Sequence, residues 1–271
     1  MSAGAKRDAE RHPDGGISVE RRGEVLLIGL DRPEKYNGLT PKMVSELVDA
    51  FTELDRDPGL RAGVVFGHGK HFTAGLDLPK WVDGMKSGGR DRSDDSRVDP
   101  FGLSRKCRKP VLCAVHGITY TAGIEFMLGC DIAIAAEDCR FSQLEPKRGI
   151  MATGGATFRF VERGGWGNAM YHLLVVDEFG AAEALRCGLV QEVVPAGTQL
   201  QRALELAEKI TRLAPLAIQA TKESARLYAE QGEKACIAAF SAVQERLANS
   251  EDAAEGVRSF VERREPKFSG R

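Results

Sequence analysis

The sequence predicts an α/β fold, because apolar runs of strand length alternate with a stretch of helical periodicity. Val25 to Leu30 and Ala62 to Gly67 are compact apolar runs, and apolar residues recur at helical spacing between them. From residue 198 onward the apolar pattern is helical throughout. A chain of 271 residues with 42% hydrophobic residues can bury a substantial core, as one large domain or as a domain with an appendage.

Residues 1–16 are expected to form a flexible tail. They mix charges of both signs with Pro13, Gly15 and Gly16 and show no apolar periodicity. Their acidic residues argue against a transit peptide. We therefore place the core domain at residues 17–197, with Val25 to Leu30 as an early strand that a turn at Arg32-Pro33 follows.

The first helix is predicted to have Thr40 as its cap and Pro41 as its first residue. Asp57-Pro58-Gly59 ends it, and Ala62 to Gly67 follows as a second core strand. This order of strand, helix and strand is typical of α/β proteins. The apolar face of the helix comprises Met43, Val44, Leu47, Val48, Phe51 and Leu54.

Two polar segments come next. Residues 68–78 form a loop in which glycines permit a tight connection. Residues 83–100 are rich in Gly, Ser and charge and have little to bury, so we expect a mobile loop, either disordered or acting as a lid over substrate.

The stretch from Val111 to Gly155 holds two notable carboxylates. It reads as an apolar strand, a tight turn, a short apolar helix, a second strand and a polar loop. Glu125 lies in the apolar helix, where a charge costs several kcal/mol unless it is paired or its pKa is shifted. Glu145 lies in the loop, 20 residues later. Each alone could be a helix-start or solvated acid, and their spacing does not by itself place them in one site.

The C-terminal part is expected to be helical. Leu189 to Val194 is predicted to be a last short strand ended by Pro195, and residues 198–271 form a helical region. Its apolar faces would either cap the core or pack against other copies of the chain.

Composition excludes several classes of function. The net charge of −1 gives no electrostatic case for nucleic acid or an acidic membrane surface as partner. The six cysteines show neither a CxxC pair nor a metal-ligand spacing, which is typical of reduced thiols in a cytoplasmic protein. No apolar run approaches the roughly 18 residues of a membrane span.

Several motifs, in order, resemble those of the enoyl-CoA hydratase/isomerase (crotonase) superfamily. Asp31 to Leu39, Phe72 to Leu78 and Ala181 to Val190 resemble the family's RPEK.NAL, F.AG.DL and A.EA...GLV segments. The resemblance extends from about residue 20 to the C-terminus. The central family pattern is matched by Lys109-Pro110-Val111, Ala114-Val115, Gly117, Ala122-Gly123, Glu125, Cys130-Asp131, Ala135, Phe141, Glu145 and Gly149.

The resemblance implies a crotonase (ClpP-like) fold of repeated ββα units, whose C-terminal helices assemble trimers or hexamers. It implies an enoyl-CoA hydratase, a hydro-lyase of the fatty-acid β-oxidation type that adds water reversibly to trans-2-enoyl-CoA. Glu145 would be the principal proton donor and acceptor, and Glu125 would help to orient and activate water. The backbone N–H groups of Ala74 and Ala122 would form an oxyanion hole.

The same resemblance implies how the acyl-CoA substrate is bound. Coenzyme A is part of the substrate, and neither a metal nor a redox cofactor is implied. Basic side chains would meet the CoA phosphates, and the 68–78 loop would border the substrate. The candidates are Arg32, Lys35 and Lys267 for the phosphates, and Gly75, Leu76, Asp77, Leu78 and Gly123 for the border.

Departures from the family pattern leave the substrate open. Thr121-Ala122-Gly123 replaces three glycines, Leu144 replaces a proline, and Met151-Ala152-Thr153 stands where Ile-Pro-Gly is common, so these residues would change the acyl pocket. Dienoyl-CoA isomerases carry a third acid at the position of Thr153, and its absence favours a hydratase. The alternatives are an enoyl-CoA isomerase or other crotonase-family enzyme, and a catalytically silent acyl-CoA-binding protein. His116 is interpreted as a hydrogen-bonded core residue rather than a base.

Overall fold

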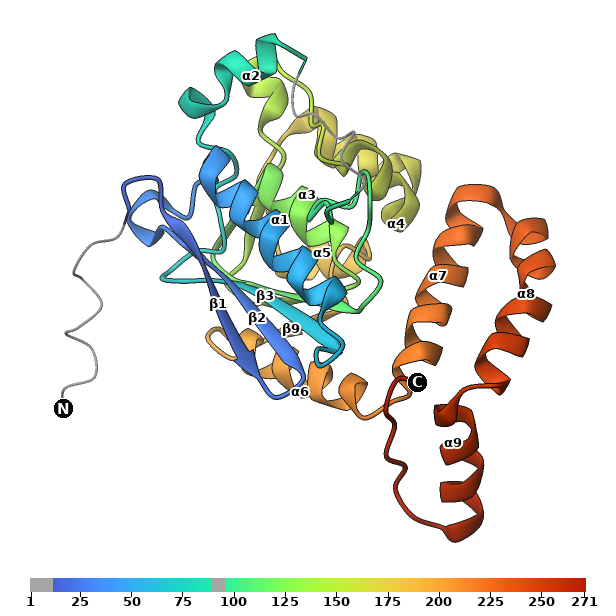
Figure 1. Ribbon diagram of the computed structural model, residues 1–271. Coiled ribbons are helices and arrows are strands. Elements are labelled where there is room, and N and C mark those ends of the chain that lie inside the picture. Colours follow the sequence, from blue (N-terminus) through green and yellow to red (C-terminus); the bar gives the residue numbers. More distant parts are fainter. Residues whose placement is uncertain (1–11, 89–95) are drawn as a thin grey trace, which may run out of the picture.

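The computed structural model describes residues 12–88 and 96–271, as an α/β core with a projecting group of C-terminal helices (Figure 1). Residues 1–11 of the expected tail and residues 89–95 of the expected mobile loop lie outside the described residues. The end of that tail is not free, because the carbonyls of Asp14 and Gly15 accept from Thr40 and Lys42 at 2.8 and 2.9 Å and Gly16 begins a strand. The 83–100 segment is helical at its start, because α2 (Val82–Lys86) continues past Asp83.

A six-stranded sheet forms the core, in the order β1-β2-β3-β4-β6-β9. Strands β1 and β2 pair antiparallel, and every other neighbouring pair is parallel. A smaller sheet has the order β5-β7-β8. The strands are β1 (Gly16–Arg22), β2 (Val25–Asp31), β3 (Ala62–Gly67), β4 (Val111–Val115), β5 (Ile118–Tyr120), β6 (Ile132–Ala136), β7 (Arg140–Ser142), β8 (Phe179–Gly180) and β9 (Glu192–Val194).

The two early strands are confirmed, whereas the last strand is shorter than predicted. Residues 189 and 190 do not join the ladder, and the backbone N–H of Gln191 donates to the carbonyl of Ala133 at 2.9 Å just before β9 begins. The side-chain oxygen of Gln191 accepts the backbone N–H of Ala133 at 2.8 Å, so the ladder begins only at Glu192.

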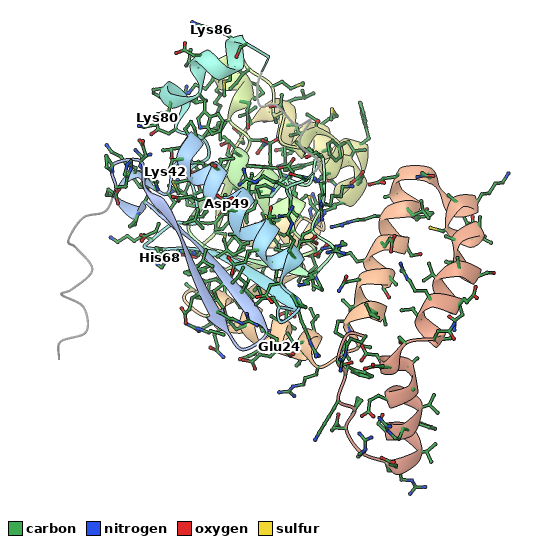
Figure 2. All side chains as sticks on the ribbon, viewed as in Figure 1. Glu24, Lys42, Asp49, His68, Lys80 and Lys86 are labelled. Atoms are coloured by element: carbon green, nitrogen blue, oxygen red, sulfur yellow. The ribbon has the colours of Figure 1, made fainter. Side chains whose placement is uncertain are left out.

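Helices cover both faces of the large sheet. Helix α1 (Pro41–Arg56) packs on one face, and Thr40 caps it by accepting the N–H of Met43 at 3.2 Å, as predicted. Its outer face carries Lys42 and Asp49 (Figure 2). Helix α6 (Gln199–Thr211) covers the opposite face. Alternate residues along β2 therefore enter two separate apolar clusters, one with α1 and one with α6.

The remaining helical segments of the core connect the strands, and some of them line the cavities described below. The 3-10 helices are η1 (Pro33–Lys35), η2 (Leu78–Lys80) and η3 (Glu145–Arg148). The α-helices are α3 (Ala122–Gly129), α4 (Ala156–Met170) and α5 (Ala181–Arg186), and a π-helical turn η4 (Tyr171–Val175) follows α4.

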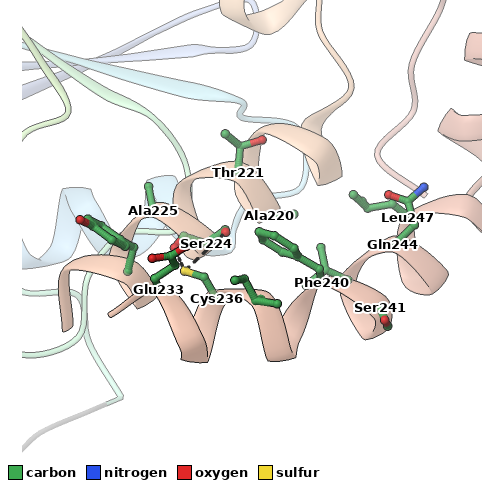
Figure 3. A pocket seen from close by; sticks show the side chains of 13 residues that line it. Ala220, Thr221, Ser224, Ala225, Glu233, Cys236, Phe240, Ser241, Gln244 and Leu247 are labelled. Carbon is green, nitrogen blue, oxygen red and sulfur yellow. Dashed lines mark hydrogen bonds between the residues drawn. The ribbon is translucent and has the colours of Figure 1, made fainter. Parts of the chain in front are cut away.

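The C-terminal helices α7 (Pro215–Gln231), α8 (Glu233–Ala248) and α9 (Glu251–Glu262) project from the core (Figure 1). The Lys222 ammonium donates to the carbonyl of Lys109 at 2.7 Å and forms an ion pair with Asp131, which ties α7 to the core. An apolar groove of about 1100 Å³ lies between α7 and α8, with Phe240 among its lining residues (Figure 3). Helices α7, α8 and α9 therefore do not cap the core and leave apolar faces exposed. Helix α6, which the prediction counted with the helical region, packs on the large sheet as part of the core instead.

All six cysteines are buried and free, in agreement with the prediction of reduced thiols. Within residues 12–88 and 96–271, every helix is too short or too polar to cross a membrane.

Candidate active site

Two adjoining cavities of about 200 Å³ each lie beyond the carboxyl ends of β3 and β4. Parallel strands end at one edge of a sheet, so the loop after β3 meets β5, which follows β4, and the turn from β5 into α3 lies beside that loop. Both predicted glutamates line one cavity, here called the carboxylate cavity. Its walls are Ala74, Leu76, Leu78, Met85, Thr121, Ala122, Glu125, Leu144, Glu145, Arg148, Ile150, Met151 and Thr153.

Glu125 is held in place by backbone groups. It lies in the first turn of α3 and is 4% exposed. Its Oε1 accepts the N–H of Gly154 at 2.6 Å and that of Ala156 at 3.2 Å. These hydrogen bonds stabilise the buried carboxylate of Glu125, and they fix it at the cavity wall.

Glu145 has a different environment. It opens the 3-10 helix η3 rather than lying in an irregular loop, and it is 8% exposed. Within the described part of the chain, no group donates to its Oε2. Burial, with the nearby charge of Glu125, raises the pKa of Glu145 from 4.5 to about 7. A carboxyl with this pKa can both donate and accept a proton near neutral pH.

The expected oxyanion donor at Ala74 is wrong in this structure. Its N–H donates to the carbonyl of Tyr36 at 2.9 Å and is already used. Two residues later, Leu76 faces Leu39 across a parallel bridge in which Leu39 bonds to Gly75 and Asp77. This pattern turns the N–H of Leu76 away from Leu39, and among the described residues it has no acceptor.

The N–H of Ala122, the other expected donor, has no acceptor among the described residues and stays a candidate. Its N–H opens α3, where no helical acceptor exists, and the described residues provide no other. The preceding residue, Thr121, adopts a positive φ of +51°, which is unusual for a β-branched residue, and its backbone sets the turn into the helix. Leu76 and Ala122 line both cavities, so their N–H groups are candidates for one oxyanion hole.

The predicted phosphate ligands do not gather at the site. Arg32 is 4% exposed and forms an ion pair with Asp77 at 2.7 Å, so it is used inside the protein and is corrected to a structural role, as is Asp77. Lys35 is exposed and stays a candidate. Lys267 follows α9, beside Phe268, whose carbonyl accepts from Arg61 at the amino end of β3. Within one chain it therefore lies at the opposite edge of the sheet from the cavities.

The predicted border residues have distinct roles. Leu76 and Leu78 line the carboxylate cavity. Gly75 and Gly123 allow close packing instead: a Cβ on Gly75 would lie 1.7 Å from Thr121 Oγ1, and one on Gly123 would lie 2.6 Å from a methyl carbon of Thr73. Of the residues that depart from the family pattern, Thr121, Ala122, Leu144, Met151 and Thr153 do line the cavity.

Sequence reasoning missed the second, mostly apolar cavity. Leu76, Met85, Ala122, Glu125 and Thr153 line both, and the second adds Val44, Trp81, Gly84, Asp99, Phe101 and Gly154. The sequence indicates Val44 only as an apolar position of the first helix, and its signal for the other residues of this cavity is weak. Asp99 accepts the N–H groups of Phe101 and Leu103 at 3.0 and 3.1 Å, which is a turn-capping role. His116 lies outside both linings and bonds to the carbonyl of Gly69 at 3.1 Å, as interpreted, but it is half-buried rather than a core residue.

The chain is similar in sequence to known enoyl-CoA hydratases over most of its length. The family model described as "Enoyl-CoA hydratase/isomerase" matches residues 20–271. Enoyl-CoA hydratase EchA19 of Mycobacterium tuberculosis is 35% identical over 258 residues, covering 93% of this chain and 96% of that protein. The 2,3-dehydroadipyl-CoA hydratase of Escherichia coli is 33% identical over 258 residues, with coverages of 94% and 99%.

Solved structures agree with these relatives. A probable enoyl-CoA hydratase/isomerase from Mycobacterium abscessus superposes with a TM-score of 0.91 at 43% identity, covering 94% of this chain and 98% of that chain. An enoyl-CoA hydratase from Mycobacterium tuberculosis superposes with a TM-score of 0.86 at 34% identity, with coverages of 96% and 100%.

Proposed function

The chain belongs to the enoyl-CoA hydratase/isomerase family, with its crotonase fold, and we infer that it is a hydro-lyase that adds water reversibly to trans-2-enoyl-CoA, forming 3-hydroxyacyl-CoA. The observation that carries the mechanism is that two buried carboxylates and two N–H donors without acceptors line one cavity. The roles of the individual residues below are part of the proposal.

The thioester oxygen would accept the N–H groups of Leu76 and Ala122. Attack at the β-carbon develops enolate charge on this oxygen, and a fixed N–H donor is worth roughly 3 kcal/mol in such a transition state. Because the donors belong to a bridge-bound loop and a helix start, they need little reorganisation during the reaction.

The two glutamates would divide the proton transfers. Glu125, fixed by the N–H groups of Gly154 and Ala156, would orient water against the β-carbon, and the glutamate pair would take one proton from that water. Glu145, which is protonated about half the time near pH 7, would give a proton to the α-carbon. One proton enters the pair and one leaves it, so the reaction balances and runs in either direction.

A hydratase fits this cavity better than an isomerase. Moving a double bond needs one acid–base group, whereas adding water also needs a group to orient the water. The presence of Glu125 in the wall of the same cavity supports that second task, and Thr153 there carries no acid.

The proposed chemistry needs no metal or redox cofactor, because acid–base groups and N–H donors supply each step, and coenzyme A is part of the substrate. We also propose a cytoplasmic location, which the six free cysteines support. Exposed apolar residues on the C-terminal helices, including Phe240 and Phe260, support assembly into a homotrimer or a hexamer.

The test is to follow the conjugated-enoyl absorbance of trans-2-enoyl-CoA thioesters, short to long and branched, with purified protein. Loss of absorbance with formation of the 3-hydroxy product is expected for at least one substrate. No change across the panel would refute the hydratase, and 3-enoyl-CoA substrates would then test for an isomerase.

A further inference from the structure

Arg148 is a basic residue in the wall of the carboxylate cavity that the proposed mechanism does not use. It ends the 3-10 helix that Glu145 begins. Side chains three residues apart eclipse on a 3-10 helix, so Arg148 and Glu145 project from the same side of η3. Among the described residues that line the two cavities, Arg148 alone is basic.

Arg148 has no protein partner within the described residues. No hydrogen bond or ion pair involves its guanidinium, whereas Arg140, Arg186 and Arg202 each bind a glutamate. Burial, a backbone hydrogen bond and Glu125 set the pKa of Glu145, so Arg148 is not the counter-ion of that acid. The guanidinium is exposed at a cavity built to receive a substrate.

A guanidinium binds planar oxyanions through paired hydrogen bonds, and a carboxylate or a phosphate suits it best. In coenzyme A the whole pantetheine arm separates the phosphates from the thioester. A cavity of about 200 Å³ that holds the reacting carbons beside both glutamates is too small to contain this arm and the phosphates as well. An anion that reaches Arg148 from the reacting carbons therefore belongs to the acyl group. The adjoining cavity has no basic lining and suits an apolar group instead.

We propose that Arg148 binds a carboxylate on the acyl group, and that the enzyme prefers enoyl-CoA substrates whose acyl chain carries such a second carboxylate. This proposal rests on the proposed hydratase function and adds a specificity-determining residue to it. Arg148 would act on binding and orientation, whereas the proton transfers would stay with the glutamates.

The experiment compares substrates of equal chain length. The kcat/KM for trans-2-hexenoyl-CoA is measured beside that for the thioester with the same six carbons and a terminal carboxylate, and five- to eight-carbon pairs are added to vary the reach. The wild type should prefer the carboxylated member of at least one pair. In Arg148→Gln, kcat/KM should fall about 10- to 100-fold for that member and change little for the uncharged one.

Matched variants separate recognition from general damage. Arg148→Lys should keep part of the preference, because it retains the charge and loses the paired geometry. Lys147→Gln removes a neighbouring exposed charge that lines neither cavity, and it should leave both substrates unchanged.

The outcomes distinguish this proposal from the hydratase function. A wild type that hydrates uncharged substrates without preferring any carboxylated partner overturns the proposal and leaves the hydratase intact. Equal losses on both members in Arg148→Gln also overturn it, since they indicate a contact with coenzyme A or a folding defect. Failure of the wild type on every thioester would instead refute the proposed function on which it rests.

Discussion

At the scale of the residue, the two glutamates differ because their surroundings differ. Glu125 receives two backbone N–H bonds, whereas Oε2 of Glu145 receives none from the described residues. Low-dielectric burial penalises the charged form of Glu145 and makes it an acid at neutral pH. The structure thus separates the roles of two identical side chains by their hydrogen bonds.

The raised pKa of Glu145 predicts a cost in stability. Its pKa is about 7 in the folded protein and 4.5 without burial, so the folded state binds the proton more tightly between these values. Stability from the protonated form is present below pH 4.5 and is lost as the pH rises to 7. Glu145→Gln, which cannot ionise, should therefore become more stable than the wild type by up to about 3 kcal/mol at pH 8, with little of this gain at pH 4.5.

Urea unfolding at fixed protein concentration, repeated from pH 4.5 to 8, measures this difference. Glu34→Gln, at an exposed position, is the control and should track the wild type throughout. If the difference in free energy of unfolding between Glu145→Gln and the wild type shrinks as the pH rises, the pKa of Glu145 is not raised in the folded state.

At the scale of the element, the oxyanion hole depends on contact between the 68–78 loop and the turn before α3. Gly75 has φ +99°, and a Cβ there would overlap Thr121 Oγ1. Gly75 precedes Leu76, and Thr121 precedes Ala122, so one contact holds both donors in register.

Gly75→Ala should move both donors and lower kcat by at least about 100-fold, since each donor is worth roughly 3 kcal/mol. Thr121→Gly in the same chain removes the clashing side chain and should restore part of the activity. Gly23→Ala is the matched control: Gly23 also has positive φ (+59°) but no atom within 4 Å of its added Cβ, so it should lower stability by about 1 kcal/mol and leave kcat unchanged. An unchanged kcat in Gly75→Ala would show that the 68–78 loop does not contribute to the active site.

Sequence reasoning reached the elements that depend on local signals. The apolar runs of β2 and β3 and the Thr40 cap of α1 follow from neighbours in the chain. It also brought Glu125 and Glu145 to one cavity, by resemblance. The prediction of Ala74 as a donor was wrong, because a bridge to Leu39, in another segment, determines which N–H of this loop has no acceptor.

Two of the phosphate candidates, Arg32 and Lys267, are likewise decided by contacts between distant segments, whereas Lys35 stays a candidate. Arg32 has the charge of a phosphate ligand, but Asp77, 45 residues away, neutralises it in the interior. The position of Lys267 depends on how the C-terminal segment returns to Arg61, which no local pattern reveals. Nothing in the sequence sets Arg148 apart from other basic residues, because most of these are solvated surface charges.

At the scale of the whole molecule, the projecting helices leave much apolar surface exposed. Phe240 is 53% exposed and Phe260 is 85% exposed, and both lie on helices outside the core. A chain that exposes such residues in extended patches gains free energy by self-association.

The predicted assembly is a homotrimer or hexamer, which light scattering after size exclusion would measure. Phe260→Glu puts a charge on the apolar face of α9 and should shift the mass toward the monomer. Lys234→Glu, an exposed change on α8, should leave the mass unaltered. A monomeric wild type would contradict the assembly.

The two-carboxylate mechanism is tested most directly by the turnover of Glu145→Gln on the best trans-2-enoyl-CoA substrate, with CoA-thioester binding measured on the same sample. We predict that kcat falls by several orders of magnitude while the fold and the binding are retained, because the amide keeps the shape of the side chain and cannot transfer the proton. Turnover close to that of the wild type would contradict the mechanism.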